Sequence, residues 1–110
     1  MTNIIQFKGL KDLEDPEQDK VKALSLEYYE KIRRLINNET SLKIDVRQYK
    51  KPGSHSTKYS IHIKALAPTK TKFEADKFDW DLARAMHKTF KALINEINHS
   101  FHKQSRMHKG

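Results

Sequence analysis

The sequence predicts an α+β domain in which a four-stranded sheet is covered on one face by two helices, in the order β-α-β-β-β-α. Two stretches carry apolar residues every three or four positions, as amphipathic helices do, and apolar and polar residues alternate between them. The chain has 110 residues, 36% of them hydrophobic, with only three Gly and three Pro. This length and composition fit one folded domain over residues 1–110, with the other face of the sheet polar and partly basic.

The first strand and the first helix are predicted within residues 4–38. A short apolar run before Gly9 indicates a strand, and it consists of Ile4, Ile5 and Phe7. After a polar connection over residues 10–14, a helix start is indicated by an N-cap carboxylate, a proline suited to the first turn and a capping-box partner, namely Asp15, Pro16 and Gln18. The apolar face continues through Val21, Leu24, Tyr28, Ile32, Leu35 and Ile36, and the helix is expected to end at Asn37 and Asn38.

The middle of the chain changes to a period of two, which predicts half-buried strands. The apolar positions of the second and third strands are Leu42, Ile44 and Val46, then Tyr59, Ile61, Ile63 and Ala65. Between them, Lys50 to Lys58 is expected to form the flexible, basic loop of an antiparallel hairpin. A turn at Ala67 and Pro68 then leads to a fourth strand, indicated by Thr71, Phe73 and Ala75.

The final helix is predicted to start at Asp79 or Asp81, with Phe78 and Trp80 packing around its start. Its apolar stripe consists of Leu82, Met86, Phe90, Leu93, Ile97 and Phe101. Its basic stripe consists of Arg84, Lys88, Lys91, Asn95, His99, His102 and Arg106. Positions two apart point about 200° apart on a helix, so the two stripes lie on nearly opposite sides, and residues 103–110 form a basic tail.

The charge is uneven along the chain. The net charge is +8, but residues 1–40 hold 7 Lys/Arg against 8 Asp/Glu, whereas residues 41–110 hold 15 against 6. Residues 82–106 contain five Lys or Arg and a single acid, Glu96. A helix face without compensating acids favours a polyanionic partner such as nucleic acid over simple solvation.

Other classes of protein are disfavoured. The chain has no Cys, and residues 1–10 lack the long apolar stretch of a signal peptide, so we expect a cytoplasmic protein that does not act at a membrane. His99 and His102 have an i, i+3 spacing without an evident third ligand, and Asp79 with Asp81 is better explained as a helix start than as an acid–base pair. We find no catalytic or phosphate-loop motif, and expect no enzyme activity, metal, cofactor or small-molecule substrate.

Basic positions on both helices, on the strands and in the hairpin loop are the candidate RNA contacts. They are Lys31, Arg33, Arg34, Lys43, Arg47, Lys50, Lys51, Lys64, Arg84, His87, Lys88, Lys91, Lys103 and Arg106. Several have structural explanations, since strand lysines protect sheet edges and cations at the end of the first helix meet the helix dipole. Because most aromatic residues fall on predicted buried faces, base stacking is not expected to be the main mode, with Tyr49 as the exception.

The element order and two segments resemble the ribosome hibernation-promoting factor family, also described as protein Y or the ribosome-associated inhibitor and sigma-54 modulation family. Residues 81–87 (DLARAMH), followed by Leu93 and Ile97, are similar to the family's start of the last helix, and residues 30–35 (EKIRRL) are similar to the basic end of its first helix. The chain resembles a short member, without the C-terminal extension that long members use to pair ribosomes.

The resemblance implies binding to rRNA of the small ribosomal subunit near the decoding centre, where the factor overlaps tRNA and mRNA and keeps idle ribosomes inactive. The matched basic positions are Lys31, Arg34, Arg84, Lys88 and Lys91. Off the ribosome we expect a monomer. Two alternatives stay open: a general double-stranded-RNA-binding module, which shares an α-β-β-β-α core, and a regulatory module whose basic face meets an acidic protein.

Overall fold

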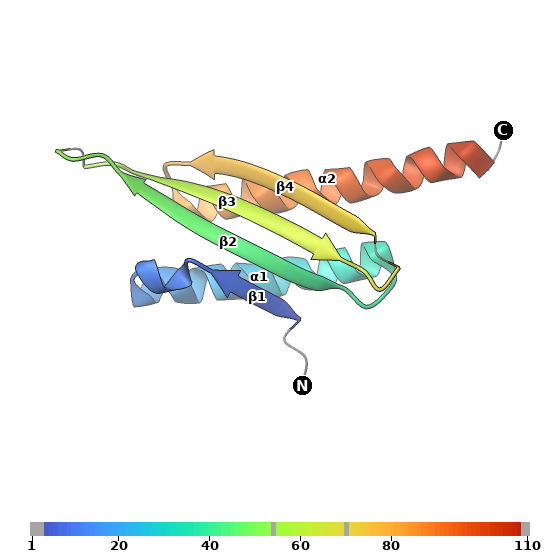
Figure 1. Ribbon diagram of the computed structural model, residues 1–110, viewed down its shortest axis with the longest axis horizontal. Helices are drawn as coiled ribbons and strands as arrows, with labels where there is room; N and C mark the ends of the chain where they lie inside the picture. The colour runs from blue at the N-terminus through green and yellow to red at the C-terminus, as the bar shows by residue number, and fades with distance from the viewer. Residues whose placement is uncertain (1–3, 54, 70, 109–110) are drawn as a thin grey trace.

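The structure, a computed structural model, describes residues 4–53, 55–69 and 71–108, with side chains up to residue 100 (Figure 1). The elements follow in the order β1 (Ile5–Lys8), a 3₁₀ turn η1 (Leu10–Asp12), α1 (Asp15–Ile36), β2 (Ser41–Lys50), β3 (Thr57–Leu66), β4 (Lys72–Asp79) and α2 (Leu82–His108). The predicted α+β fold and its β-α-β-β-β-α order are confirmed. Helix α2 includes residues 103–108, most of the segment predicted as a basic tail.

The four strands form one mixed sheet in the order β1-β2-β3-β4. Strand β1 pairs in parallel with β2, so that Ile5 lies opposite Leu42, and α1 is the connection that a parallel pair requires. Strands β2, β3 and β4 are antiparallel, with Ile44 opposite Ile63 and Ile63 opposite Ala75. This register places the apolar positions of the central strands on one face.

Both helices cover that apolar face, behind the sheet in the view of Figure 1. Helix α1 lies along the β1–β2 side and α2 along the β4 side, and both run from the hairpin end toward the opposite end of the sheet. The largest fully buried apolar side chains come from both helices and both central strands: Phe90, Ile32, Leu42, Ile44, Ile61, Ile63, Met86, Leu93, Ile97 and Val21. These predicted apolar positions therefore form the core of a two-layer sandwich, whereas the side chain of Phe101, also predicted on the apolar stripe, lies outside the described residues.

The strands at the hairpin are longer than the prediction. Strand β2 continues to Lys50 and β3 begins at Thr57, so residues 51–56 make the connection. Strand β4 continues past Ala75 to Asp79, which lies opposite Tyr59. Backbone pairing does not require an apolar side chain at alternate positions, and this explains why alternation underestimates these strands.

The start of α1 also differs from the prediction. Its N-cap is Glu14, not Asp15, and the capping partner is Glu17, whose Oε1 accepts a 3.3 Å hydrogen bond from the backbone N of Glu14. The side chain of Gln18 instead donates to the Leu13 carbonyl at 2.8 Å. Proline at the first turn fits either start, so the sequence signal located the helix but placed its cap one residue late.

Gly9 makes the tight exit from β1 possible. Its φ is +84°, a left-handed conformation that L side chains rarely adopt, and a Cβ there would overlap the carbonyl oxygen of Val46 on β2. Gly53 in the hairpin has a similar φ of +81°, but nothing lies near the position of its Cβ. Both glycines therefore have a backbone angle that disfavours other residues, but only at Gly9 would a side chain also collide with a neighbouring strand.

Helix α2 begins with two aspartates. Oδ1 of Asp79 accepts a 3.1 Å hydrogen bond from the backbone N of Asp81, and Oδ1 of Asp81 accepts a 2.9 Å hydrogen bond from the backbone N of Arg84. Asp81 thus acts as the N-cap, as predicted. The expectation that Phe78 and Trp80 pack around this start was wrong, because they are 52% and 62% exposed.

The two helices meet at Tyr28. Its ring stacks on Phe90, with centroids 4.5 Å apart and planes 8° from parallel, and its hydroxyl lies 2.6 Å from Nδ1 of His87. Another hydrogen bond joins the sheet to the helix layer, because the Tyr59 hydroxyl on β3 donates to Glu17 Oε2 on α1 at 2.9 Å. Burial and this bond raise the pKa of Tyr59 to about 12.

Candidate nucleic-acid interface

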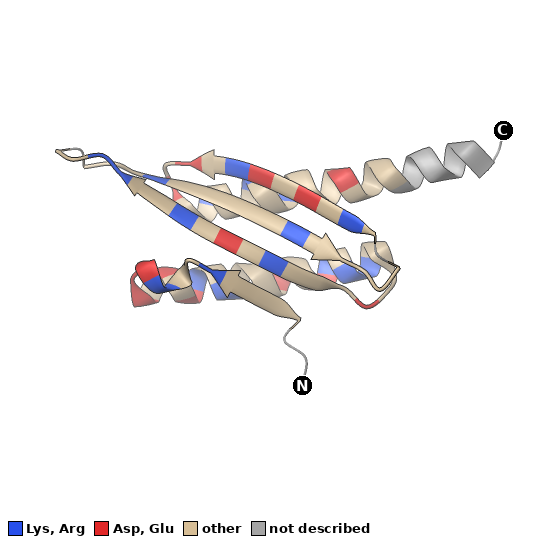
Figure 2. Cartoon of the chain, viewed as in Figure 1, with Lys and Arg blue, Asp and Glu red and all other residues tan. Residues whose placement is uncertain are grey.

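The strands of the sheet contain both basic and acidic residues (Figure 2), and several of them belong to the face away from the helices, here called the open face. Register places Lys43 opposite Lys64, and Arg47 opposite Ser60. Its cations are Lys8, Lys43, Arg47, Lys58, Lys64 and Lys72, and its acids are Asp45, Glu74 and Asp76. The open face is therefore polar and partly basic, as the sequence predicts.

Two of the three predicted RNA contacts on the open face have acidic partners. Arg47 lies 3.5 Å from Asp45, and Lys64 lies 3.5 Å from Glu74. Interactions with Tyr49 and then Asp45 also raise the pKa of Arg47. Lys43 is exposed and, within the described part of the chain, has no carboxylate partner. Exposed pairs such as these are weak, so a phosphate can still compete for the cations.

Helix α1 divides its charge between its two ends (Figure 2). Acidic residues occupy its first turn, whereas Arg33 and Arg34 occupy its last. Lys31 lies over the Tyr28 ring, with Nζ 5.3 Å from the centroid, and Arg33 lies 3.4 Å from Glu30. Lys31 and Arg34 are exposed and are not paired with an acid among the residues described here. Of the predicted contacts on α1, these two are therefore the cations that no described acid neutralises.

The basic stripe of α2 is partly neutralised by a residue outside the helix, which corrects the prediction that compensating acids are missing. Asp79, only 7% exposed at the end of β4, accepts a 2.7 Å bond from Lys88 Nζ and lies 3.9 Å from Arg84. The bond from Lys88 and the backbone N–H of Asp81 lower the pKa of Asp79 despite its partial burial. Lys91 is exposed and, of the described residues, no acid pairs with it.

His87 is not part of a presented basic surface, contrary to the prediction. It is half-buried and is bonded to Tyr28 across the helix junction. The partner is 59 positions away in the sequence. His87 therefore joins α1 to α2, and the sequence around His87 could not show a contact with a partner on the other helix.

The predicted contacts do not form one patch. The helix layer holds Lys31, Arg33, Arg34, Arg84, Lys88 and Lys91, whereas the open face holds Lys43, Arg47 and Lys64. Lys50 and Lys51 lie at the hairpin, beyond both sets, and the side chains of Lys103 and Arg106 lie outside the described residues. The structure thus separates the candidates onto the two sides of a molecule measuring 58 × 33 × 19 Å.

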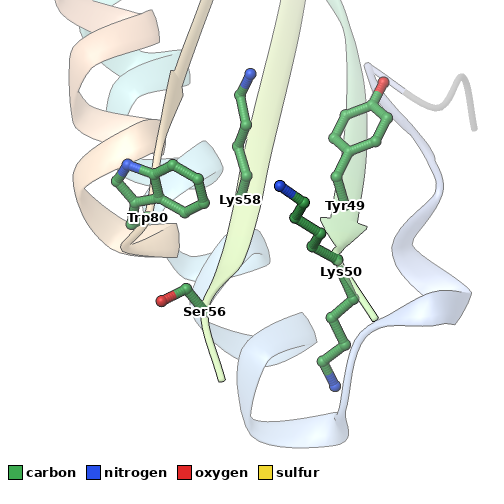
Figure 3. Close-up of a pocket in the computed structure, with 6 residues that line it drawn as sticks. Tyr49, Lys50, Ser56, Lys58 and Trp80 are labelled. Carbon is green, nitrogen blue, oxygen red and sulfur yellow. The ribbon is translucent and has the colours of Figure 1, made fainter. Parts of the chain in front are cut away.

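Among the described residues, hollows of the surface are found on the open face and at the hairpin. One, of about 590 Å³, is lined by Tyr49, Lys50, Lys51, Ser56, Lys58 and Trp80 and is here called the hairpin cleft (Figure 3). Another, of about 420 Å³, includes Lys8, Lys43 and Lys64. The sequence prediction missed Lys58 and Trp80 as parts of a site. Trp80 could have been found from the alternation of β4, because it continues the solvent-facing series Glu74, Asp76 and Phe78.

The part of the chain that is described contains neither a cluster of metal-ligating side chains nor a membrane-spanning helix. No three His, Cys, Asp or Glu side chains there come together as a metal site, and the side chain of His102 lies outside that part. Among the same residues, α1 and α2 lack the unbroken apolar length that a membrane-spanning helix requires.

Comparison with known proteins identifies no family, since no protein-family model matches the sequence and no curated protein shows significant similarity to it. The resemblance to hibernation factors therefore stays a prediction.

Proposed function

We propose that this protein binds rRNA of the small ribosomal subunit and inhibits translation by occupying the channel that tRNA and mRNA use. The observation that carries the proposal is the presence of exposed cations on both layers of a thin domain. The resemblance of its last helix to hibernation factors supports the choice of the small subunit as the RNA partner. Occlusion requires binding alone, so the proposal includes no catalytic step and no cofactor.

The helix layer contributes Lys31, Arg34 and Lys91. Each is exposed, and in the described chain no acid forms an ion pair with any of them. Lysine and arginine side chains of this kind neutralise phosphates and release bound counterions, which gives affinity without reading sequence. These three cations are the primary contacts that we propose on this layer.

The opposite layer contributes Lys43 on the open face, and Lys50 lies beyond both layers at the hairpin. The shortest dimension of the molecule, 19 Å, exceeds the screening length of roughly 8–10 Å at physiological salt, so the two layers act on different phosphates. An RNA duplex that lies against one side of the molecule contacts one layer and leaves the other layer in solvent. A channel lined by RNA touches both, which favours the ribosomal proposal over a general duplex-binding module.

The test is co-sedimentation of the full chain with ribosomes and with separated subunits over a salt series, in the presence of excess duplex RNA. We expect binding to the small subunit that resists this competitor. Loss of the protein to the duplex would instead support the general module. Survival of a complex after nuclease treatment would support a protein partner.

A variant carrying Lys31→Gln, Arg34→Gln and Lys91→Gln tests the helix layer. Each lost phosphate contact reduces the slope of log affinity against log salt by roughly 0.7–0.9, so three should reduce it by about two to three. The matched control, Lys11→Gln with Lys20→Gln and Lys22→Gln, removes the same charge from exposed positions near the acidic start of α1. An equal loss in both variants would mean that only net charge matters and would contradict the proposed contacts.

A further inference from the structure

The hairpin cleft brings together residues from three strands. Tyr49 near the end of β2 lies opposite Lys58 on β3, and Trp80 follows directly after β4. In Figure 3 the Lys58 side chain lies between the indole ring of Trp80 and the phenol ring of Tyr49. The volume of about 590 Å³ is within the range of roughly 300–1,000 Å³ that is usual for small-ligand sites.

The walls of the hairpin cleft are aromatic and accessible. Trp80 is 62% exposed and Tyr49 is 53% exposed, although both rings could bury much more apolar area against a partner. Phe78 beside them is also exposed, and Lys58 Nζ lies 4.2 Å from its ring centroid. This contact holds an ammonium group in place next to the open rings.

The charge of the hairpin cleft has one sign. Lys50, Lys51 and Lys58 line it, and the described residues of its lining include no Asp or Glu. This differs from the rest of the open face, where Arg47 and Lys64 each have an acidic partner. A ligand that fits the hairpin cleft therefore combines a flat ring system with negative charge.

We propose that the hairpin cleft binds an unpaired nucleotide of RNA, with its base stacked on Trp80 and in contact with Tyr49, and its phosphates against Lys50 and Lys51. Stacking on aromatic side chains beside a cationic groove is the usual way in which proteins hold single-stranded RNA. The inference rests on the proposed function, because it assigns to the same RNA partner a looped-out or terminal nucleotide at the hairpin end.

Trp80 is the one tryptophan of the chain, so its fluorescence reports directly on the hairpin cleft. The full-length protein is titrated with a short single-stranded adenylate RNA, a duplex of equal length, an abasic oligomer and free AMP. We expect the single strand to quench the fluorescence at lower concentration than the duplex. The abasic oligomer, which has phosphates without bases, is expected to cause little quenching.

The contribution of each ring is then tested by measuring the affinity of ring-deletion variants for the labelled single-stranded RNA by fluorescence anisotropy. Stacking of one base corresponds to roughly 5- to 150-fold in affinity, so Trp80→Ala and Tyr49→Ala are expected to weaken binding by factors in this range. Leu26→Ala, which removes an equally exposed side chain from α1, is the control and should bind normally. Circular dichroism verifies that the variants fold.

The outcomes separate this inference from the proposed function. Binding without quenching, or unchanged affinity of Trp80→Ala, would overturn the nucleotide site, whereas co-sedimentation with the small subunit would remain. Quenching by AMP as strong as that by the oligomer would overturn RNA as the source of the nucleotide. Loss of co-sedimentation in the wild type would contradict the proposed function itself.

Discussion

The hydrogen bond between Tyr28 and His87 should contribute a measurable part of the stability. Tyr28→Phe keeps the ring stacked on Phe90 and removes only the hydroxyl, which lies 2.6 Å from Nδ1 of half-buried His87. A net loss of about 0.5–1.5 kcal/mol in the free energy of unfolding is expected. With a urea dependence of roughly 1–3 kcal/mol per molar, the midpoint should fall by about 0.5 M.

Removing the whole ring should cost much more. Tyr28 is only 8% exposed, and truncating a buried aromatic side chain to alanine usually costs about 3–5 kcal/mol. Domains of this kind have only about 5–15 kcal/mol in total, so Tyr28→Ala should lose a large share of it. The difference between the two variants measures the stacked ring separately from the hydrogen bond.

Urea unfolding followed by circular dichroism measures both effects. Tyr49→Phe is the matched control, because this tyrosine is 53% exposed and the same atom is removed. The reasoning would be refuted if Tyr28→Phe were as stable as the wild type, or if Tyr49→Phe lost as much as Tyr28→Phe.

Three further predictions concern the backbone, the pH dependence and the ion pair at the start of α2. In urea unfolding, Gly9→Ala should destabilise the protein by clearly more than Gly53→Ala. Each alanine costs roughly 1–2 kcal/mol because it must adopt a left-handed backbone, but only the Cβ at position 9 would also overlap the backbone of Val46 on β2. Equal losses would contradict this. The pKa of Tyr59 is about 12 in the folded protein, above the ordinary value of 10.0. The contribution of Tyr59 to the free energy of unfolding is therefore fully present below about pH 10 and is lost as the pH rises toward 12. Tyr59→Phe should therefore lose less stability than the wild type between about pH 10 and pH 12, as measured by urea unfolding at successive pH values. The same pH dependence in both proteins would contradict this prediction. Lys88→Glu should lower the melting temperature more than Lys91→Glu, because only Lys88→Glu places a carboxylate next to the buried carboxylate of Asp79 at the end of β4. The reverse order of melting temperatures would contradict the contact between Lys88 and Asp79.

Much of the fold follows from the sequence because each strand has one buried face. Alternation at Ile44, Val46, Ile61 and Ile63 fixes which side of the sheet meets the helices, and a shift of one residue would place all of them in solvent. The spacing of apolar residues around Phe90 does the same for α2. The layers and their order are therefore predictable without any knowledge of register.

The site is less predictable because it depends on contacts between distant residues. Helical spacing placed Lys88 on a basic stripe, but its neutralising partner, Asp79, belongs to the preceding strand. The partner of His87 lies on the other helix. Trp80 joins Tyr49 in the hairpin cleft only through the register of three strands. Local pattern carries no information on such pairs.

The two-sided contact with RNA that we propose is tested most directly from the surface of the protein itself. Because the chain has no Cys, Lys91→Cys on the helix layer and Lys43→Cys on the open face each provide one site for a tethered iron chelate that cleaves nearby RNA. In complexes with the small subunit, both probes are expected to cleave rRNA, at different positions around one channel. Cleavage from one layer alone would contradict insertion between RNA walls and would indicate docking through a single face.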